Sequence, residues 1–464
     1  MLLLCGVLFV VTALALPAAW LTSRTNLIGS KYFTLLLVLP LAVPGYVMAY
    51  ALLGLAGYKG MLSTMMGRTV MPLTGYWGAL LALSLYNFPY MFLNLRSALM
   101  DLDPSLEEAA RSLGDGRRAM LRRVIVPQLT PAYMAGAMLV ALHVIADFGV
   151  VSLMGFDTFS LKLYVNLEYG DRANASRIGL LLLVFAAILI TVEMWFLRGL
   201  RLDRVGGGAQ RATRLVRLGW LQTPGVVLLG LIFIAGVVVP AATLIYWLSQ
   251  IESMGSIMAT VWDALSSSLL LGVLPAICAT ALAVPIAIMR ARFPSRRSLI
   301  YERLPYIGYA TPALAFALSL IFFARHLPWL YQSFGLLVYA LTLHFMAEAV
   351  GPVRSSLYLA TPRMEEASRS LGRGRFATFV RVTLPTLRNG LIVSMALVFL
   401  SCMKELPLTM LLSPPGTRTL ATRVWSYSDD AQFHLAAPHA LMILIFSCGF
   451  VALLLVSGRQ KRKN

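Results

Sequence analysis

Long apolar runs alternate with short polar or basic segments along the whole chain. An apolar run of roughly 18 residues or more is long enough to cross a bilayer as a helix. In the C-terminal half we expect spans near Val226–Leu248, Ser266–Met289, Pro305–Ala324, Phe334–Val353, Asn389–Met403 and Ala437–Val456. In the N-terminal half we expect spans near Leu2–Leu21, Phe33–Leu55, Thr74–Leu93, Ala132–Leu153 and Ile178–Leu197. The pattern therefore predicts an all-α polytopic membrane protein with about 11 visible spans, five followed by six.

One polar segment occurs twice between the predicted spans. Pro104–Pro127 reads PSLEEAARSLGDGRRAMLRRVIVP and Pro362–Pro385 reads PRMEEASRSLGRGRFATFVRVTLP, with 14 of 24 positions identical. The constant offset of 258 residues (372 − 114 = 258) indicates two similar halves in one chain. We therefore expect an N-terminal repeat over residues 1–200, a basic cytoplasmic linker over 201–222 and a C-terminal repeat over 223–464, with polar loops at 103–127 and 361–385.

Composition and charge agree with a membrane protein. Hydrophobic residues make up 59% of the chain and charged residues 13%. The net charge of +19 comes from arginines and lysines in short loops, the pattern that orients helices with their basic loops inside, and it does not indicate a nucleic-acid partner. The four cysteines lie in apolar segments without CxxC spacing, so we expect neither disulfides nor a metal site from them.

The two halves differ by one span at the start. If the linker and the C-terminal tail are both cytoplasmic, five spans place Met1 outside, and we expect that a first helix of the N-terminal repeat is missing. The alternative is a cleaved signal peptide at the N-terminus. The charge order disfavours it, because Arg24 and Lys31 follow the apolar run and no basic residue precedes it.

Each copy of the duplicated segment reads as a short helix. Asp103 and Thr361 are suitable N-caps, and Gly114 and Gly372 are expected as left-handed C-caps. An interfacial helix on lipid would need only amphipathicity. The fixed residue order favours instead a coupling helix that docks on a cytoplasmic partner.

The order E-E-A-x(3)-L-G-x(10–12)-P resembles the signature loop of inner-membrane permeases of binding-protein-dependent ABC importers. The resemblance implies a type I importer fold with two fused permease repeats, no cofactor, a periplasmic solute-binding protein and a cytoplasmic ABC ATPase homodimer that performs the hydrolysis, so that this chain is not an enzyme. The residues implied to contact the ATPase are Glu107, Glu108, Ala109 and Gly114, and Glu365, Glu366, Ala367 and Gly372. The chain is expected in a bacterial inner membrane, in contact with lipid.

Within that family the chain most resembles the ferric-iron permeases. The segments that carry this likeness are Ala146–Val150 with Thr158–Ser160, and Met403–Pro407 with Thr417–Trp425. Thiamine and aminoethylphosphonate permeases have similar segments and remain alternatives. An ion-driven secondary transporter is disfavoured, because its repeats would be expected to carry midplane polar sites, whereas here a loop is duplicated.

Ionisable residues inside the predicted spans are candidates for the translocation path, because such residues usually face a bundle interior or an aqueous cavity. Asp147 and Glu405 are repeat partners, since 405 − 147 = 258. They either line the path or tie helices together. His143, His344 and Glu348 could contact a metal ion or form interhelical hydrogen bonds.

The outer segments Ser152–Ser176 and Pro407–Pro438 are candidates for docking the binding protein. Arg418 and Arg423 could pair with acidic residues on its lobes, and Asp171 and Asp429 share the 258-residue offset. Ordinary solvated loops are the alternative.

Overall fold

The chain folds almost entirely into helices. The computed structural model describes residues 1–57, 59–102, 108, 110, 112–114, 116–198, 215–251, 253–359 and 362–460. In these ranges every regular element is helical, and the extended contacts are isolated bridges between Thr25 and Val216 and between Gly57 and Val70. The predicted all-α class is confirmed.

The chain divides into two compact units by its internal contacts. Unit 1 comprises Met1–Lys162 and Leu181–Ser249, and unit 2 comprises Leu163–Leu180 and Gln250–Asn464. The helices α10 (Phe159–Glu168) and α11 (Arg172–Arg198) each contribute residues to both units.

Unit 1 is built around α5 (Gly75–Asp101). Phe88, Met91, Phe92 and Leu95 are almost completely buried and recur at helical spacing, so they form one continuous apolar face. This helix packs against α1 (Leu2–Arg24), α3 (Gly45–Leu55), α8 (Val126–Ala146) and α9 (Gly149–Leu153). The smaller elements of the unit are α2 (Ser30–Leu36), η1 (Leu39–Ala42), α4 (Met61–Met66), α7 (Arg117–Met120), the π-helix η2 (Leu121–Ile125) and η3 (Gly219–Leu221).

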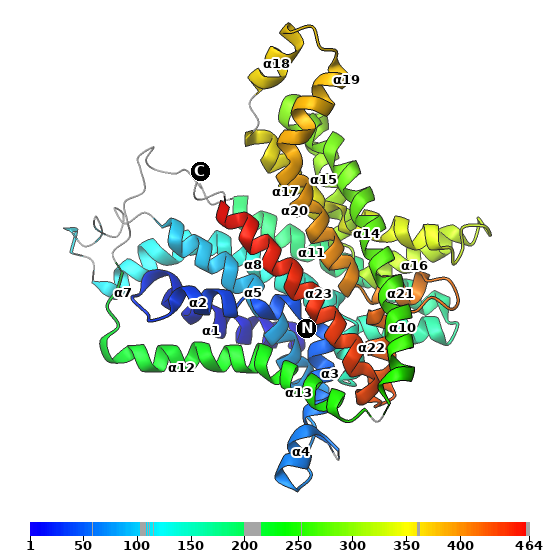
Figure 1. Cartoon of the computed structure of the whole chain (residues 1–464). Coiled ribbons are helices and arrows are strands. Elements are labelled where there is room, and N and C mark those ends of the chain that lie inside the picture. Colours follow the sequence, from blue (N-terminus) through cyan, green and yellow to red (C-terminus); the bar gives the residue numbers. More distant parts are fainter. Residues whose placement is uncertain are drawn as a thin grey trace. The chain divides into compact units, whose positions relative to one another are not determined.

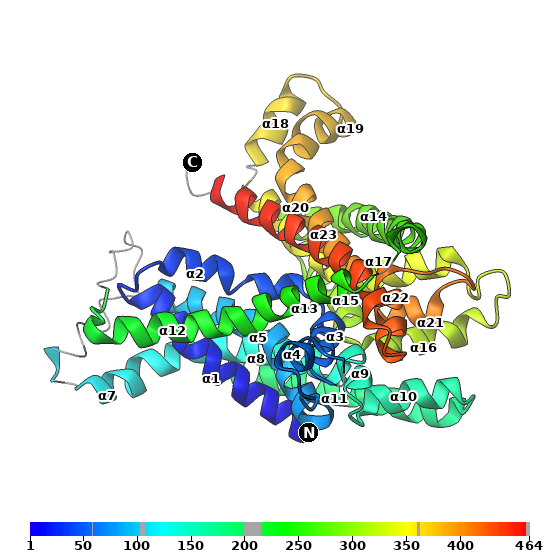
Figure 2. The same cartoon turned by 60° about the horizontal axis from the view of Figure 1, so that its bottom comes forward.

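A helix that follows the linker completes unit 1. It consists of α12 (Gln222–Phe233), the π-helix η4 (Ile234–Val238) and α13 (Val239–Ser249). The segment runs along α1, α2 and α3 (Figures 1 and 2). Trp247 anchors it: the side chain is 9% exposed, and Nε1 donates a hydrogen bond to the Gly54 carbonyl at 3.0 Å.

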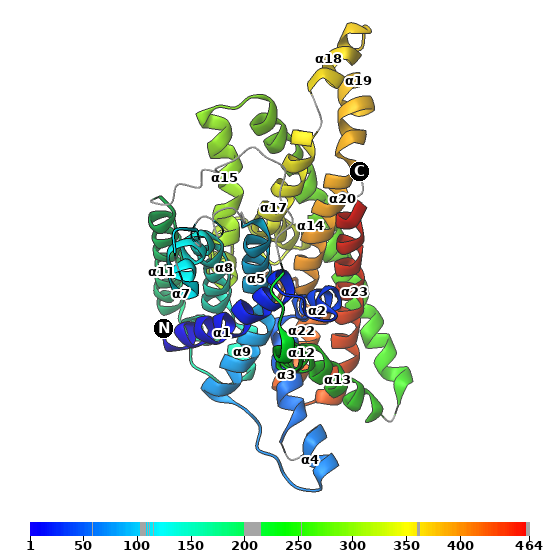
Figure 3. The ribbon, with the colours of Figure 1, turned by 90° about the vertical axis from the view of Figure 1, so that its left-hand side faces the viewer.

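Unit 2 repeats this plan around α17 (Phe334–Leu359). That helix packs against α14 (Met254–Arg292), α15 (Arg296–Ala310) and α20 (Leu384–Lys404). Figure 3 shows α14 and α20 beside α23 (Phe433–Gln460), which also packs on α22 (Leu420–Asp429). On the other side, α16 (Ala313–Ala324) packs on α21 (Pro407–Leu412).

The candidate membrane spans are fewer than the sequence predicts. Among the described residues, 8 single helices are long and apolar enough to cross a membrane, and two bent helix pairs raise the number to 10. The helix over the predicted span Thr74–Leu93 is α5, which lies in the centre of unit 1 and is not among these candidates. The count of 11 stays a prediction.

Two predicted straight spans are broken helices. The segment Phe33–Leu55 bends by 94° before α3, and the pair α15 and α16, which covers Pro305–Ala324, bends by 102°. Each break precedes a proline, because the proline ring pushes the preceding residue out of the helical region. Val43 before Pro44 has ψ 115°, and Thr311 before Pro312 has ψ 127°.

The helices of the two repeats correspond, but the sequence offset between equivalent residues changes twice along the chain. The offset is 312 − 44 = 268 at the two bends and 354 − 96 = 258 in the central helices, so the first repeat has ten extra residues between these points, where α4 lies. Past the duplicated segment, the left-handed residues Gly170 and Ala431 differ by 261. The structural partner of Asp429 is therefore Glu168, which corrects the pairing of Asp171 with Asp429.

Candidate functional site

The second copy of the duplicated segment projects from one end of unit 2. It consists of α18 (Pro362–Ser370), α19 (Arg375–Thr378) and the π-helix η5 (Phe379–Thr383), which continues into α20. Figure 1 shows α18 and α19 beyond the ends of α17 and α20. We call this segment and its counterpart around α7 the coupling elements, a name taken from the role that the sequence predicts for them.

The glycine at the end of α18 adopts the predicted left-handed conformation. Gly372 has φ 81°, and its N–H donates to the Arg369 carbonyl at 2.9 Å. Arg373 N–H donates to the Ser368 carbonyl at 3.3 Å, which completes a Schellman cap. Gly114 in the first copy has φ 82°. The predicted left-handed conformation is confirmed at both glycines.

Part of the first coupling element lies outside the described residues. Glu107 and Ala109 fall there, as do both predicted N-caps, Asp103 and Thr361. Glu108 is described and exposed.

The two glutamates of the second motif have different surroundings. Glu365 turns back toward unit 2 and forms an ion pair with Arg292 at the end of α14, with 3.0 Å between Oε1 and Nη2. Both side chains are largely buried, at 15% and 13% exposure. Arg369 lies 3.5 Å from the other carboxylate oxygen. Glu366 and Ala367 are instead exposed. Glu365 therefore fixes α18 to the span, and its neighbours face outward.

Large apolar side chains are also exposed on both elements. Leu113 is 85% exposed and its repeat partner Leu371 is 80% exposed. Phe376 in α19 is 80% exposed as well. These side chains surround polar and basic residues, so they offer small apolar contacts on an otherwise charged surface.

Sequence reasoning missed the π-helical turn that joins each coupling element to its span. Leu121–Ile125 and Phe379–Thr383 share the 258-residue offset, and each ends two residues before a proline. A proline in a helix lacks an N–H and clashes with the carbonyl four residues back, and a widened turn accommodates both. The prolines were visible in the sequence, but the widened turn was not.

The intramembrane candidates occupy equivalent positions of the two repeats. In unit 1, His143 of α8 stacks on Tyr90 of α5, with ring centroids 4.7 Å apart. Adding 258 to these positions gives Ser401 and Glu348 in unit 2, where the Ser401 hydroxyl donates to the Glu348 carboxylate at 2.7 Å. Lys404 interacts electrostatically with the same carboxylate. Each pair connects the two central helices of its unit.

His344 lies one turn before Glu348 on α17. The side chain is 6% exposed and packs against Phe316 and Phe345, with ring centroids 5.6 and 4.9 Å away. Its repeat partner is Tyr86, because 344 − 86 = 258. In the described part of the chain no group of three or more His, Cys, Asp or Glu side chains could hold a metal ion.

Asp147 and Glu405 make the same contact in both repeats. The Asp147 carboxylate accepts from the Val150 N–H at 2.8 Å, and the Glu405 carboxylate accepts from the Leu408 N–H at 3.0 Å. Each carboxylate thus accepts a hydrogen bond from a backbone N–H in the first turn of the short helix that follows its span, α9 or α21. This geometry gives both residues a local structural role.

The outer candidates are placed differently from one another. Arg418 and Asp429 are exposed, whereas Arg423 lies over the Tyr427 ring, 5.3 Å from the centroid. Asp171 is exposed and accepts from the Asn174 N–H at 3.1 Å, at the start of α11.

A group of acidic residues near Tyr164 in unit 2 was not predicted. Burial, Glu168 and Asp429 together raise the pKa of Tyr164 to about 12. Burial also raises the pKa of Asp429, with further contributions from Asp430 and Glu168. Tyr164, Glu168, Asp429 and Asp430 therefore lie close enough to influence one another electrostatically.

Two helical repeats, each with a copy of the duplicated segment next to its central helices, together with several apolar helices long enough to cross a bilayer, are typical of a polytopic membrane protein. The family model described as binding-protein-dependent transport system inner membrane component matches residues 12–202 and 283–462. Both matches contain a copy of the duplicated segment. The chain belongs to this family, and it is a multi-pass permease subunit of the inner membrane.

Individual relatives narrow the comparison. The chain is 31% identical over 435 residues to Fe(3+)-transport system permease protein FbpB 2 of Haemophilus influenzae, covering 92% of this chain and 83% of that protein. It is 22% identical over 461 residues to the ferric transport system permease protein FbpB of Actinobacillus pleuropneumoniae, covering 93% of this chain and 66% of that one. The sulfate transport system permease protein CysT of Salmonella typhimurium is 28% identical over 179 residues, 37% of this chain and 65% of CysT.

Proposed function

We propose that this chain is the fused two-repeat permease of an ABC importer and that it carries ferric iron from a periplasmic binding protein to the cytoplasm. The observation that carries the choice of substrate is the extent of similarity. The likeness to the Fe(3+) permease of Haemophilus influenzae runs over 92% of the chain, whereas the likeness to the sulfate permease covers 37%. A shared coupling region alone would not extend so far.

The coupling elements are the proposed docking sites for a homodimer of ATPase subunits, one element per subunit. Glu366, Ala367 and Leu371 are exposed together at the end of unit 2, and Glu108 and Leu113 are exposed in the first copy. An apolar side chain in a charged surround suits a shallow groove on a soluble protein, because it would be buried on docking while its polar neighbours form the rim.

The ion pair between Glu365 and Arg292 supports a route for the motion. A displacement of α18 by the ATPase would be passed to α14 through this contact, and through the π-helical turn to α20. Alternating access would follow if ATP closes the two partner subunits and draws the elements together. In this scheme ATP hydrolysis occurs in the partner.

Two further assignments remain proposals. Asp147, Glu405, His143, His344 and Glu348 would lie along the path between the central helices. Arg418, Asp429, Asp171 and Arg423 would belong to the surface that receives the binding protein, where all but Arg423 are exposed.

The test of the substrate is uptake. A strain that lacks this chain should lose uptake of radiolabelled ferric iron supplied on the cognate binding protein, and the intact gene should restore it. Thiamine and aminoethylphosphonate uptake are measured in the same strain as controls. Normal iron uptake together with loss of either control would move the substrate to that alternative, while the permease assignment would stand.

The test of coupling compares two pairs of glycines. Gly114 and Gly372 form one pair, and Gly116 and Gly374, two residues further along each element, form the other. Gly114 and Gly372 are left-handed, and a Cβ added at either would meet no atom within 4 Å, so alanine there strains only the backbone. The cost is about 1–2 kcal/mol per site. We expect Gly114→Ala with Gly372→Ala to disfavour the capped conformation by about five- to thirtyfold at each element and so to lower ATPase stimulation by the loaded binding protein.

The matched control is Gly116→Ala with Gly374→Ala. Gly374 has φ −65°, which alanine adopts freely, and both positions are equally open. The control should keep stimulation and membrane insertion. Full stimulation in the left-handed pair would exclude the capped helix as the docking contact.

A further inference from the structure

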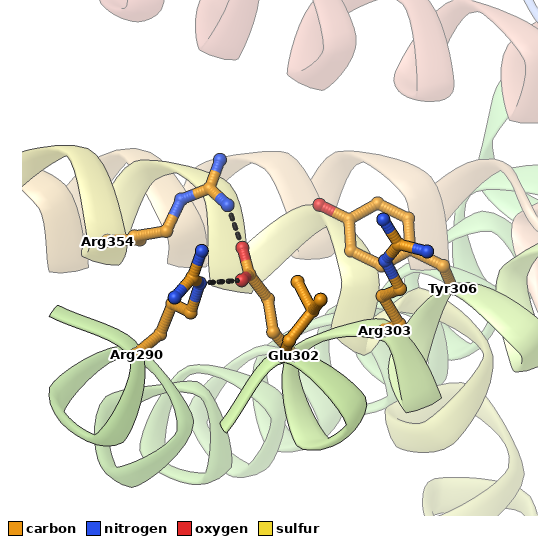
Figure 4. Close-up of a pocket in the computed structure, with 6 residues that line it drawn as sticks. Arg290, Glu302, Arg303, Tyr306 and Arg354 are labelled. Carbon is orange, nitrogen blue, oxygen red and sulfur yellow. Dashed lines mark ion pairs between the residues drawn. The ribbon is translucent and has the colours of Figure 1, made fainter. Parts of the chain in front are cut away.

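A pocket of about 360 Å³ opens in unit 2 where three helices meet. It is lined by Arg290 of α14, by Leu299, Glu302, Arg303 and Tyr306 of α15, and by Arg354 of α17. Figure 4 shows Arg290 and Arg354 reaching the Glu302 carboxylate from two different helices, with Arg303 and Tyr306 farther along α15.

The pocket carries an excess of positive charge. Glu302 is 5% exposed, and both of its oxygens are engaged, Oε2 by Arg290 Nε at 2.8 Å and Oε1 by Arg354. The pocket lining therefore holds three guanidinium groups and one carboxylate, a net charge of 3 − 1 = +2. Arg303 is exposed and forms no ion pair with any residue in the described ranges. Such a site attracts an anion, and guanidinium groups bind phosphate oxygens in bidentate fashion.

The pocket lies near the ends of two candidate membrane spans, the level at which lipid headgroups are expected. Arg290 is two residues from the end of the candidate span Ile257–Arg292, and Arg354 is four residues from the end of Phe334–Tyr358. The second coupling element lies at the same end of α14, because Arg292, the last residue of that helix, pairs with Glu365 of α18. Basic pockets between helices at this level suit anionic headgroups.

An apolar surface flanks the pocket on the same helix. Ile300, Leu304 and Ile307 are 59%, 50% and 65% exposed. They follow the pocket residues by one position, which places them about 100° around α15. A ligand with a phosphate in the pocket and acyl chains along this face would cover both surfaces, whereas free phosphate would leave the apolar face uncovered.

The fold itself does not require the pocket. Subtracting the repeat offset of 268 places Thr22 and Thr34 of the first repeat at the positions of Arg290 and Glu302, and Leu35 at the position of Arg303. Only the arginine on the central helix, Arg96 opposite Arg354, is shared. The first repeat therefore has uncharged residues in place of Arg290, Glu302 and Arg303, and its extra basic residue, Lys31, stands at the position of Leu299.

We propose that this pocket binds the phosphate headgroup of an anionic phospholipid, with the acyl chains lying along the exposed face of α15. The contacts come from Arg303 and from the outer N–H groups of Arg290 and Arg354. Glu302 holds the latter two arginines in place.

The experiment titrates the purified full chain in detergent with short-chain phosphatidylglycerol, short-chain phosphatidylcholine or inorganic phosphate, and counts bound molecules by native mass spectrometry. We expect saturable binding of one phosphatidylglycerol molecule at this site. Arg303→Gln should weaken it by about tenfold, the worth of one charge-assisted hydrogen bond. Arg297→Gln is the matched control, because Arg297 is an exposed arginine on the same helix outside the pocket.

Every outcome bears on the site. Phosphatidylglycerol binding that Arg303→Gln weakens and Arg297→Gln leaves within about twofold supports it. Equal weakening by both variants would mean attraction by surface charge and overturn the pocket. Equal binding of phosphatidylcholine would overturn the charge selectivity, and equal binding of inorganic phosphate would overturn the lipid source. None of these measurements depends on iron transport or on an ATPase.

Discussion

Adjacent identical residues in the coupling element have unlike roles. Glu365 is paired with Arg292 and largely buried, whereas Glu366 is exposed at the surface proposed to meet the ATPase. The first should therefore contribute to the stability of the element, and the second should contribute only to contact with the partner.

Glu365→Gln should loosen α18. The substitution removes the ion pair between Glu365 and Arg292, and the loss of a hydrogen bond between charged groups costs about 1.5–3 kcal/mol. The population of the opened element should rise by about ten- to a hundredfold. The measurement is the rate of trypsin cleavage after Arg369 and Arg373, under conditions in which the spans stay protected by detergent.

Glu366→Gln is the control, since it changes the same charge one residue away. It should leave the cleavage rate unchanged. Equal acceleration by both variants would contradict the assignment of different roles and would point to a general effect of negative charge on α18.

The sequence was informative about residues whose role is local. The left-handed glycines could be predicted because a short helix with acidic residues at its start and a glycine at its end specifies its own cap. The difference between Glu365 and Glu366 could not be predicted, because it depends on Arg292, 73 residues earlier in the chain. Glu302 was missed for the same reason, since its two arginines lie on other helices.

At the scale of elements, apolar runs predicted most helices but not their bends. The runs Phe33–Leu55 and Pro305–Ala324 each fold as two helices at a steep angle. A hydropathy average over a long window does not detect such a break. A proline does not predict it either, because the continuous helix α5 contains Pro89. Only the packing of neighbours distinguishes a broken helix from a continuous one.

The helix α12–α13 should be essential for unit 1. Trp247→Ala removes a buried ring and the hydrogen bond to Gly54, a loss of about 3–5 kcal/mol. The midpoint of thermal unfolding, followed by circular dichroism in detergent, should fall accordingly.

Trp262→Ala provides the comparison, because Trp262 is also a helical tryptophan but is 69% exposed. It should change the free energy of unfolding by about 0.5 kcal/mol or less. Similar losses from both substitutions would contradict the role of Trp247 as the anchor of the segment.

At the scale of the whole molecule, repetition and packing divide the chain differently. The duplicated segments and the matching central helices α5 and α17 define repeats, as the sequence predicts. The contact units place α12 and α13 with the N-terminal helices and a short piece of α10 and α11 with the C-terminal ones. Composition does not predict this division into contact units, because the apolar residues of a helix do not specify which neighbouring helix it packs against.

The orientation of the chain in the membrane is testable with single cysteines. Cys5, Cys278, Cys402 and Cys448 are first replaced by alanine. Cysteines at Ser295 and Ser370, on the side of the second coupling element, should resist a membrane-impermeant thiol reagent in cells with a permeabilised outer envelope. Cysteines at Tyr331 and Asp429 should react.

All four positions are exposed, so burial does not account for a lack of reaction. After the inner membrane is opened with detergent, all four should label. Labelling of Ser370→Cys in intact cells would place the coupling element outside and would remove the basis for its contact with an ATPase.

The packing of α13 on α3 also has a consequence for biosynthesis. During synthesis from the N-terminus, Gly54 leaves the ribosome 193 residues before Trp247, the residue that covers it in the folded unit. At about 5–20 residues per second, that interval lasts about 10–40 seconds. During it, the face of α3 must be held by lipid or by the insertion machinery. A pause or premature stop inside the linker would strand an N-terminal half with that face uncovered, and quality-control proteases could recognise it before the second half existed.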